Sequence, residues 1–233
     1  MRKYKIVTVL ILAFCMMLTL SMSVFAEQKD KENSKQHFRM VANKNQIKIL
    51  QSLYKKDVSY GELVEKVYPE ALEHISDKVL EQMYKTKVNW KNENPQSTQY
   101  SESTSYGTSQ STDIGIRSPY VLLQGVEHES TITKGSGYIT HTSRSTVVQP
   151  FGLKIPSMTV ISMLVQDDVG TVASEIDTGA NDWNVFAPTP PKPYNYPLRG
   201  KFYYTLGSHF GEYLPGSTPA TYSIGTNTAI ISY

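Results

Sequence analysis

The chain has 233 residues, a formal net charge of +2 at pH 7, 39% hydrophobic residues and a single cysteine. This length allows either one sizeable hydrophobic core or a small domain joined to a larger one. The near-neutral charge excludes the strong overall field that draws nucleic-acid-binding and anionic-lipid-binding proteins to their partners.

Residues 1–26 have the pattern of a secretory signal peptide. A basic start is followed by an apolar stretch from Ile6 to about Leu20, and the segment ends in small or short residues at Val24 and Ala26. We therefore expect cleavage after Ala26 and a secreted protein. The alternative is an uncleaved membrane anchor, because the apolar run is almost long enough to span a bilayer.

The lone cysteine lies inside this leader. Cys15 follows Phe14, where a bacterial lipid-attachment motif has Gly, Ala or Ser, so it is interpreted as part of the signal. The exported chain then has no cysteine and can form neither a disulfide framework nor a thiolate metal site. Its 20 Lys and Arg face 21 Asp and Glu, and the composition is typical of a bacterial, Gram-positive export substrate.

Residues 27–95 are rich in Lys, Glu and Asn. Residues 27–36 lack apolar periodicity and are expected to be a disordered start. From there to residue 95 the sequence predicts a small helical region. Ile47, Leu50 and Tyr54 form one apolar stripe of a first helix, and Ser59 with Glu62 forms a capping box that begins a second.

A third helix is expected over residues 69–88. Pro69 suits the first helical turn, and Leu72, Ile75, Val79 and Met83 form the apolar face. Three such helices make a small bundle or a packed cap. A DNA-binding helix-turn-helix is the other interpretation, but export argues against any nucleic-acid partner.

The run from Gln96 to Arg117 has a period of two. Its serines fall on odd positions, while its Thr, Tyr and Ile fall on even positions. This alternation predicts a β-strand with the strand-forming residues on one face, bent near Gly107. A flexible tether and a sugar-carrying stalk remain the alternatives.

The rest of the chain reads as short strands between turns, with separate strands expected over residues 137–143 and 145–149 and a break at Gly179. Residues 96–233 therefore predict an antiparallel β-sandwich or barrel, and the whole chain a mainly β fold. The segment from Met158 to Gln166 is apolar on nearly both faces and should be the central strand. The C-terminal segment ends in Ile230, Ile231 and Tyr233 and should be tied into a sheet.

No phosphate-binding loop, HExxH, GxSxG or EF-hand pattern occurs in the chain. His209 and Glu212 would offer a base and an orienting carboxylate if a bend brought them together. In an extended strand they point to opposite sides, and a surface histidine with a solvated glutamate is the simpler interpretation. His128 and His141 form a further candidate imidazole pair.

An acidic interval follows the expected central strand. Oxygen ligands on flexible loops are what Ca²⁺ requires, and extracellular calcium is abundant enough for weak sites. The same residues are common in ordinary turns, so no cofactor is expected beyond this weak calcium candidate. The candidate ligands are Asp167, Asp168, Asp177 and Asp182, with Glu175 and Asn181 nearby.

Aromatic residues gather around a proline-rich loop near residues 183–204. Prolines impose an extended path that loses little entropy on ordering, and exposed rings on such a loop would bind glycan rings or a partner chain. The alternative is a loop that crosses a sheet edge with its rings packed inward. The candidate binding residues are Trp183, Phe186, Tyr194 and Tyr196.

These features favour a secreted bacterial, non-enzymatic protein that binds a glycan or a protein partner at the cell envelope or outside the cell. One alternative is a membrane-acting toxin or bacteriocin, in which the Ser/Thr alternation would form a transmembrane hairpin and make membrane contact. Another is a secreted hydrolase that uses His209, Glu212 or the acidic residues.

Overall fold

The computed structural model describes residues 37–91, 114–117, 121–123, 125–148, 155–182, 184–187, 193–213 and 216–233. The expected signal peptide, the expected disordered start and most of the Ser/Thr run, up to residue 113, lie outside the described residues. Phe38–Tyr233 form one unit, to which the following description applies.

One antiparallel sheet contains the central strand predicted from the sequence. Its order is β1 (His37–Val41), β7 (Gly170–Asp182), β6 (Ile155–Gln166), β10 (Phe202–Glu212) and β11 (Thr221–Asn227). The middle strand β6 is buried at almost every position, which confirms the prediction from its apolar sequence. The short β12 (Ile231–Ser232) pairs with β10, so the C-terminal segment is tied into this sheet as expected.

The second sheet is built on one long hairpin. Its order is β2 (Ile114–Arg117), β4 (Val126–Gly135), β5 (Tyr138–Val147) and β8 (Asn184–Ala187). Two further short strands complete it, because β3 (Val121–Leu123) pairs with β4 and β9 (Tyr194–Asn195) pairs with β5. Strand β2 is the only described part of the Ser/Thr run, and it is extended as predicted.

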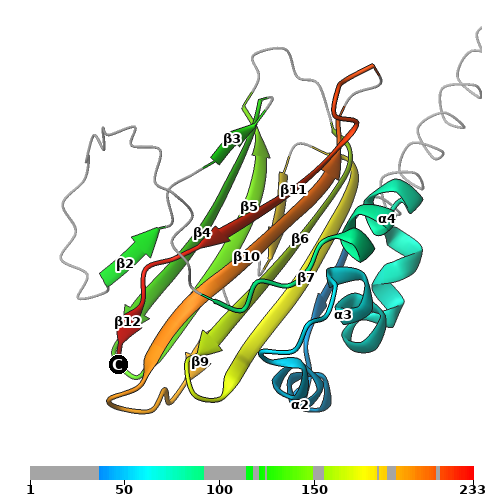
Figure 1. Ribbon diagram of the computed structural model, residues 1–233. Coiled ribbons are helices and arrows are strands. Elements are labelled where there is room, and N and C mark those ends of the chain that lie inside the picture. The colour runs from blue at the N-terminus through cyan, green and yellow to red at the C-terminus, as the bar shows by residue number, and fades with distance from the viewer. Residues whose placement is uncertain are drawn as a thin grey trace, which may run out of the picture. The chain divides into compact units, whose positions relative to one another are not determined.

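The two sheets face each other and share apolar side chains at both ends of their interface (Figure 1). At one end Val126 of β4 packs with Met158 and Val160 of β6. At the other end Ile139 of β5 packs with Leu164 of β6. The protein is therefore mainly β with antiparallel, sandwich-like sheets, as its sequence predicts.

Several predicted strand breaks are absent. The sequence places a break at Gly179, but β7 continues through it because Gly179 pairs with Met158 of β6. Likewise β5 joins two segments that the sequence reads as separate strands. Long ladder partners hold these segments extended despite their weak local preference.

The helices α2 (Lys44–Leu53) and α3 (Tyr60–Val67) begin at capping boxes. Ser59 accepts from the Glu62 amide, and the Glu62 carboxylate accepts from the Ser59 amide, as the sequence predicts. Asn43 and Gln46 form an equivalent box at α2 that the sequence interpretation missed. Each box satisfies amides that have no partner within their helix.

The predicted third helix is wrong as a single element. It is divided into the 3-10 helix η1 (Pro69–His74) and the helix α4 (Asp77–Lys85). Ile75 between them is extended, and the Ser76 hydroxyl accepts from the Val79 amide as the N-cap of α4. A serine N-cap begins a new helix even where the apolar spacing continues across it. The cap at Ser76 therefore ends the single helix that the periodicity predicts.

The helices cover the outer face of the first sheet (Figure 1). Leu50, Leu63 and Val79 pack with Ile161 and Met163 of β6 in one apolar cluster. The helices therefore act as a packed cap on the sheet. None of the helices in the described ranges has the length and apolar character needed to cross a bilayer.

Candidate functional site

A layer of polar side chains lies between the two sheets, between their apolar ends. Strand alternation places it there, because even positions of β4 and odd positions of β5 point inward together with Val126 and Ile139. The members are fully or almost fully buried: His128, Ser130, His141, Ser143, Ser145, Ser162, His209 and Thr226. We call these eight residues the buried hydroxyl–histidine chain.

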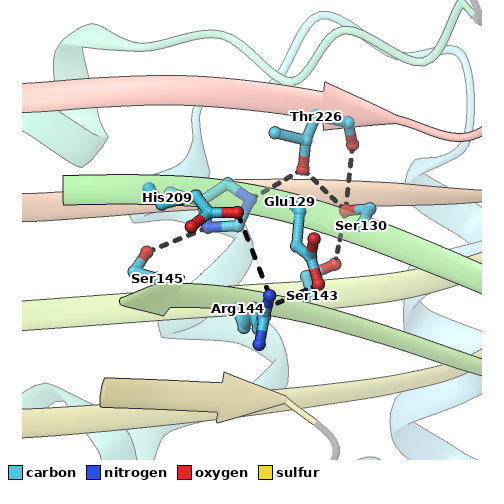
Figure 2. Close-up of polar contacts among 8 residues, drawn as sticks. Glu129, Ser130, Ser143, Arg144, Ser145, His209 and Thr226 are labelled. Atoms are coloured by element: carbon cyan, nitrogen blue, oxygen red, sulfur yellow. Dashed lines mark hydrogen bonds and ion pairs between the residues drawn. The ribbon is translucent and has the colours of Figure 1, made fainter. Parts of the chain in front are cut away.

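The first half of this hydrogen-bonded series joins β4, β5, β10 and β11. Figure 2 shows its Ser145, His209 and Thr226. The Ser145 hydroxyl lies 3.0 Å from Nδ1 of His128 and 3.0 Å from Nδ1 of His209. Nε2 of His209 lies 2.7 Å from the Thr226 hydroxyl. One serine thus bonds two imidazoles from opposite sheets.

The second half continues from Thr226 through three serines to the last histidine. Thr226 and Ser130 are 2.6 Å apart, and Ser130 and Ser143 are 2.7 Å apart. Ser143 donates to Ser162 at 3.1 Å, and Ser162 lies 2.9 Å from Nδ1 of His141. The buried hydroxyl–histidine chain therefore connects the two sheets through an unbroken series of side-chain hydrogen bonds. Such a buried network favours a single packing arrangement of the core.

A glycine makes room for these hydroxyls. A Cβ atom on Gly207 of β10 would lie 2.1 Å from the Ser130 hydroxyl, 2.4 Å from Thr226 and 2.6 Å from Ser143. Because all three are short side chains fixed to strands, they have little room to retreat. The close approach of the two sheets at this level thus requires glycine at position 207.

Burial keeps the three histidines neutral. It lowers the pKa of His128 and the pKa of His141 to about 4. Burial also places the pKa of His209 well below its usual value, and the neighbouring His128 lowers that pKa further. Each neutral ring has one donor and one acceptor nitrogen. Both nitrogens of His209 meet hydroxyls, whereas His128 and His141 meet theirs through Nδ1, and Nε2 of His128 is buried without a hydrogen-bond partner among the described residues.

Ser145 and His209 have the spacing of a nucleophile and its base, but they are not placed for catalysis. Both are fully buried, so no substrate reaches the hydroxyl. The other imidazole nitrogen meets the Thr226 hydroxyl, whereas an activated serine needs a group that stabilises the imidazolium. The contact is therefore one of core packing.

His209 and Glu212 point to opposite sides of the first sheet, as their positions on a strand predict. Glu212 faces the helices, where it accepts from Ser76 and from Lys78, the latter at 3.0 Å. The interpretation of His209 as a surface residue is wrong, since its ring is fully buried. They form no acid–base pair.

On the outer face of the β4–β5 hairpin, Arg144 pairs with two carboxylates (Figure 2). Its Nε lies 2.6 Å from Glu129, directly opposite on β4, and Nη2 lies 3.9 Å from Glu127. This ion pair stabilises the hairpin from the side opposite the buried chain.

The candidate calcium ligands are spread along one hairpin. Asp167 and Asp168 lie in the β6–β7 turn, where Lys201 binds Asp168 at 2.5 Å. Asp177 lies in the middle of β7, fully buried, and accepts from Arg39 at 2.9 Å. The side chain of Asp182 is outside the described residues. Within the described ranges, no group of three or more acidic or histidine side chains is placed to hold a metal ion.

The aromatic candidates have different environments. Trp183 and the side chain of Phe186 lie outside the described residues. Tyr194 is half-buried beside Tyr203, with ring centroids 6.2 Å apart, and supports the core. Tyr196 is 88% exposed. Its φ is 60°, a left-handed conformation that is rare and strained for a bulky residue.

Tyr196 lines a surface hollow of about 620 Å³ at the β4–β5 turn. We call it the Tyr196 hollow. Its lining combines two tyrosine rings, two cationic side chains and a glycine-rich turn: Lys134, Gly135, Ser136, Gly137, Tyr196, Pro197, Arg199 and Tyr233. This set offers flat apolar surface together with hydrogen-bond donors.

Several contacts fix this hollow. The Tyr196 amide donates to the Gly137 carbonyl at 3.0 Å. The Tyr233 hydroxyl accepts from the Gly137 amide at 2.5 Å and donates to the Gly135 carbonyl at 3.3 Å. Lys134 holds its ammonium 5.0 Å from the centre of the Tyr233 ring. The turn, the Tyr196 backbone and the Tyr233 ring are thus held together before any ligand arrives, and the exposed Tyr196 ring is free to meet a ligand.

A second hollow, of about 410 Å³, lies between the segment after α4 and the β10–β11 pair. Tyr60, Thr86, Asn89 and Ser223 line it with the backbone of Gly225. Tyr60 is buried and receives a hydrogen bond from Ser208 at 2.5 Å. This second hollow has no exposed aromatic residue with a strained backbone among its described lining residues, unlike the Tyr196 hollow.

No protein-family model matches the chain, and no curated protein and no solved structure matches it either.

The sequence interpretation found Tyr196 but missed its neighbours in the hollow. Lys134, Arg199 and Tyr233 are far apart in the chain and meet only because β9 pairs with β5 and β12 pairs with β10. The tight Gly135–Gly137 turn was the available signal, since it marks where a hairpin ends.

Proposed function

We propose that the chain is a secreted, non-enzymatic protein that binds a glycan at the cell envelope or outside the cell through the Tyr196 hollow. The observation that carries this proposal is that Tyr196, which lines the hollow, has an exposed ring on a strained, left-handed backbone. Sugar rings stack on exposed aromatic faces, and hydroxyl groups accept from donors such as those of Lys134 and Arg199.

The backbone strain at Tyr196 supports a functional role. A left-handed conformation costs a bulky residue on the order of 1–3 kcal/mol, and such strain clusters at ligand-binding sites. The exposed side chain returns little packing energy, so stability alone does not account for tyrosine here. Glycine would fit the same backbone at lower cost.

The architecture supports binding over catalysis. We infer a β-sandwich whose buried hydroxyl–histidine chain joins the sheets, with a helical cap on one outer face. In such a scaffold the loops at the ends of the strands carry the ligand-contacting residues. The serine–histidine contact inside it is closed to substrate.

The test replaces Tyr196 with glycine in the purified secreted protein. Y196G removes the ring and relieves the backbone, so we expect the free energy of unfolding to change by less than about 1 kcal/mol. Retention on insoluble bacterial cell walls should be lost. Co-sedimentation measures retention, and urea unfolding measures stability.

The matched control is K55G. Lys55 is the other described non-glycine residue with positive φ, at 61°, and it is exposed away from the hollow. This variant should show a similar small change in stability and full retention. Equal retention by wild type and Y196G, or no retention by wild type, would overturn the proposal. Leakage of dye from liposomes would instead favour a membrane-acting protein.

A further inference from the structure

The charges of the Tyr196 hollow restrict the ligand further. Of its lining side chains, Lys134 and Arg199 are cationic and none is acidic. The acidic residues of the β6–β7 turn are not among the lining residues, and Asp168 of that turn pairs with Lys201 at 2.5 Å. A ligand that enters the hollow therefore meets two positive groups without a compensating carboxylate side chain in its lining.

Lys134 is fixed within the lining of the hollow by two contacts. Its ammonium donates to the Ser232 carbonyl at 3.0 Å and lies over the Tyr233 ring. An ammonium group has three donors, so further hydrogen bonds are available for a ligand oxygen. Because the side chain is half-buried, its charge is less screened than that of a free surface lysine.

Arg199 lines the hollow from the loop between β9 and β10. The next residue, Gly200, donates its amide to the Tyr233 carbonyl at 2.7 Å, which ties this loop to the C-terminal strand. The exposed guanidinium offers a planar fork of donors that matches a carboxylate or phosphate group.

We propose that the Tyr196 hollow binds a sugar residue that carries an anionic group, with the anion between Arg199 and Lys134 and the ring against Tyr196. This inference rests on the proposed glycan-binding function and adds the charge of the ligand. Carboxylate and phosphate share the required chemistry, as in polyuronates and in polyol-phosphate polymers.

The experiment measures binding by isothermal titration calorimetry with three probes. Oligogalacturonate carries carboxylates, a glycerol-phosphate oligomer carries phosphates, and a dextran oligomer is neutral. We expect binding of one or both anionic probes, no binding of dextran, and weaker binding as salt rises. Loss of a hydrogen bond to a charged group in R199Q or K134Q should weaken binding about tenfold.

K48Q is the matched control, because Lys48 is exposed on α2 and its loss changes the net charge equally. Its affinity should stay within about twofold of wild type. The two anionic probes identify the source of the anion. Equal binding of dextran, or an R199Q effect no larger than that of K48Q, would overturn the charge inference but leave the glycan proposal intact. Failure of all three probes and of cell walls would overturn both, as would binding only to vesicles that contain anionic lipid.

Discussion

Lowering the pH from 7.5 to 4.5 is expected to reduce the free energy of unfolding by about 5 kcal/mol through His128 and His141 alone. Burial lowers the pKa of each of these histidines from its usual 6.5 to about 4. The unfolded chain therefore binds more protons than the folded chain in this range. His209, whose pKa is also lowered, adds to the loss.

The direction follows from proton linkage. Because the folded-state pKa is below the unfolded value, the stabilisation is fully present above about pH 6.5 and is lost as the pH falls toward 4. Small domains have on the order of 5–15 kcal/mol of stability, so this loss brings the protein close to unfolding. Among the described residues, Glu175 and Asp177 of β7 are charged groups that also face the space between the two sheets, and both pair with Arg39 of β1.

Urea unfolding at half-unit pH steps between 7.5 and 4.5 measures the effect. H141Q removes one titrating ring, so its slope of stability against pH between 6.5 and 5 should be shallower by about one proton. H74Q is the control, because His74 is exposed on η1 and stacks on Phe38. A flat pH profile in wild type would contradict the burial of neutral imidazoles between the sheets.

Gly207→Ala is expected to destabilise the protein by about 3 kcal/mol or more, although it adds one methyl group. The new Cβ would overlap the hydroxyls of Ser130, Thr226 and Ser143. Relief requires the sheets to separate, which breaks hydrogen bonds of the buried chain. Thermal and urea unfolding measure the loss.

Gly225→Ala is the matched control on the neighbouring strand. Gly225 pairs with Ser208 of β10, and a Cβ there would have no atom within 4 Å. Since alanine restricts the unfolded chain more than glycine, this variant should be neutral or slightly stabilising. Similar losses in both variants would show that glycine is needed for strand geometry and that the hydroxyl layer is not the cause.

The sequence predicted the features that local patterns control. Alternation of apolar and polar residues identifies the strands, and the continuous apolar run of Met158–Gln166 identifies the central one. Capping chemistry identifies the start of α3 at Ser59. Ser76 caps α4 in the same way. The sequence interpretation missed this helix start, because the apolar stripe continues across it and predicts a single helix.

The buried hydroxyl–histidine chain could not be predicted from the sequence, because it depends on which strands of the two sheets face each other. Parity correctly places His209 and Glu212 on opposite faces, but it does not tell which face is covered by a second sheet. His209 is buried because β5 of the other sheet lies across it, where Ser145 meets its ring. The charge of the Tyr196 hollow was hidden for the same reason, since Lys134 and Arg199 meet only through strand pairing.

Amide chemical-shift mapping by NMR, with oligogalacturonate or the glycerol-phosphate oligomer titrated into the purified protein, tests the proposed binding most directly. The largest shifts should fall on Lys134–Gly137, on residues 196–200 and on Tyr233, and Y196G should abolish them. Shifts concentrated instead at Thr86–Asn89 and Ser223–Asn227, around the second hollow, would contradict binding at the Tyr196 hollow.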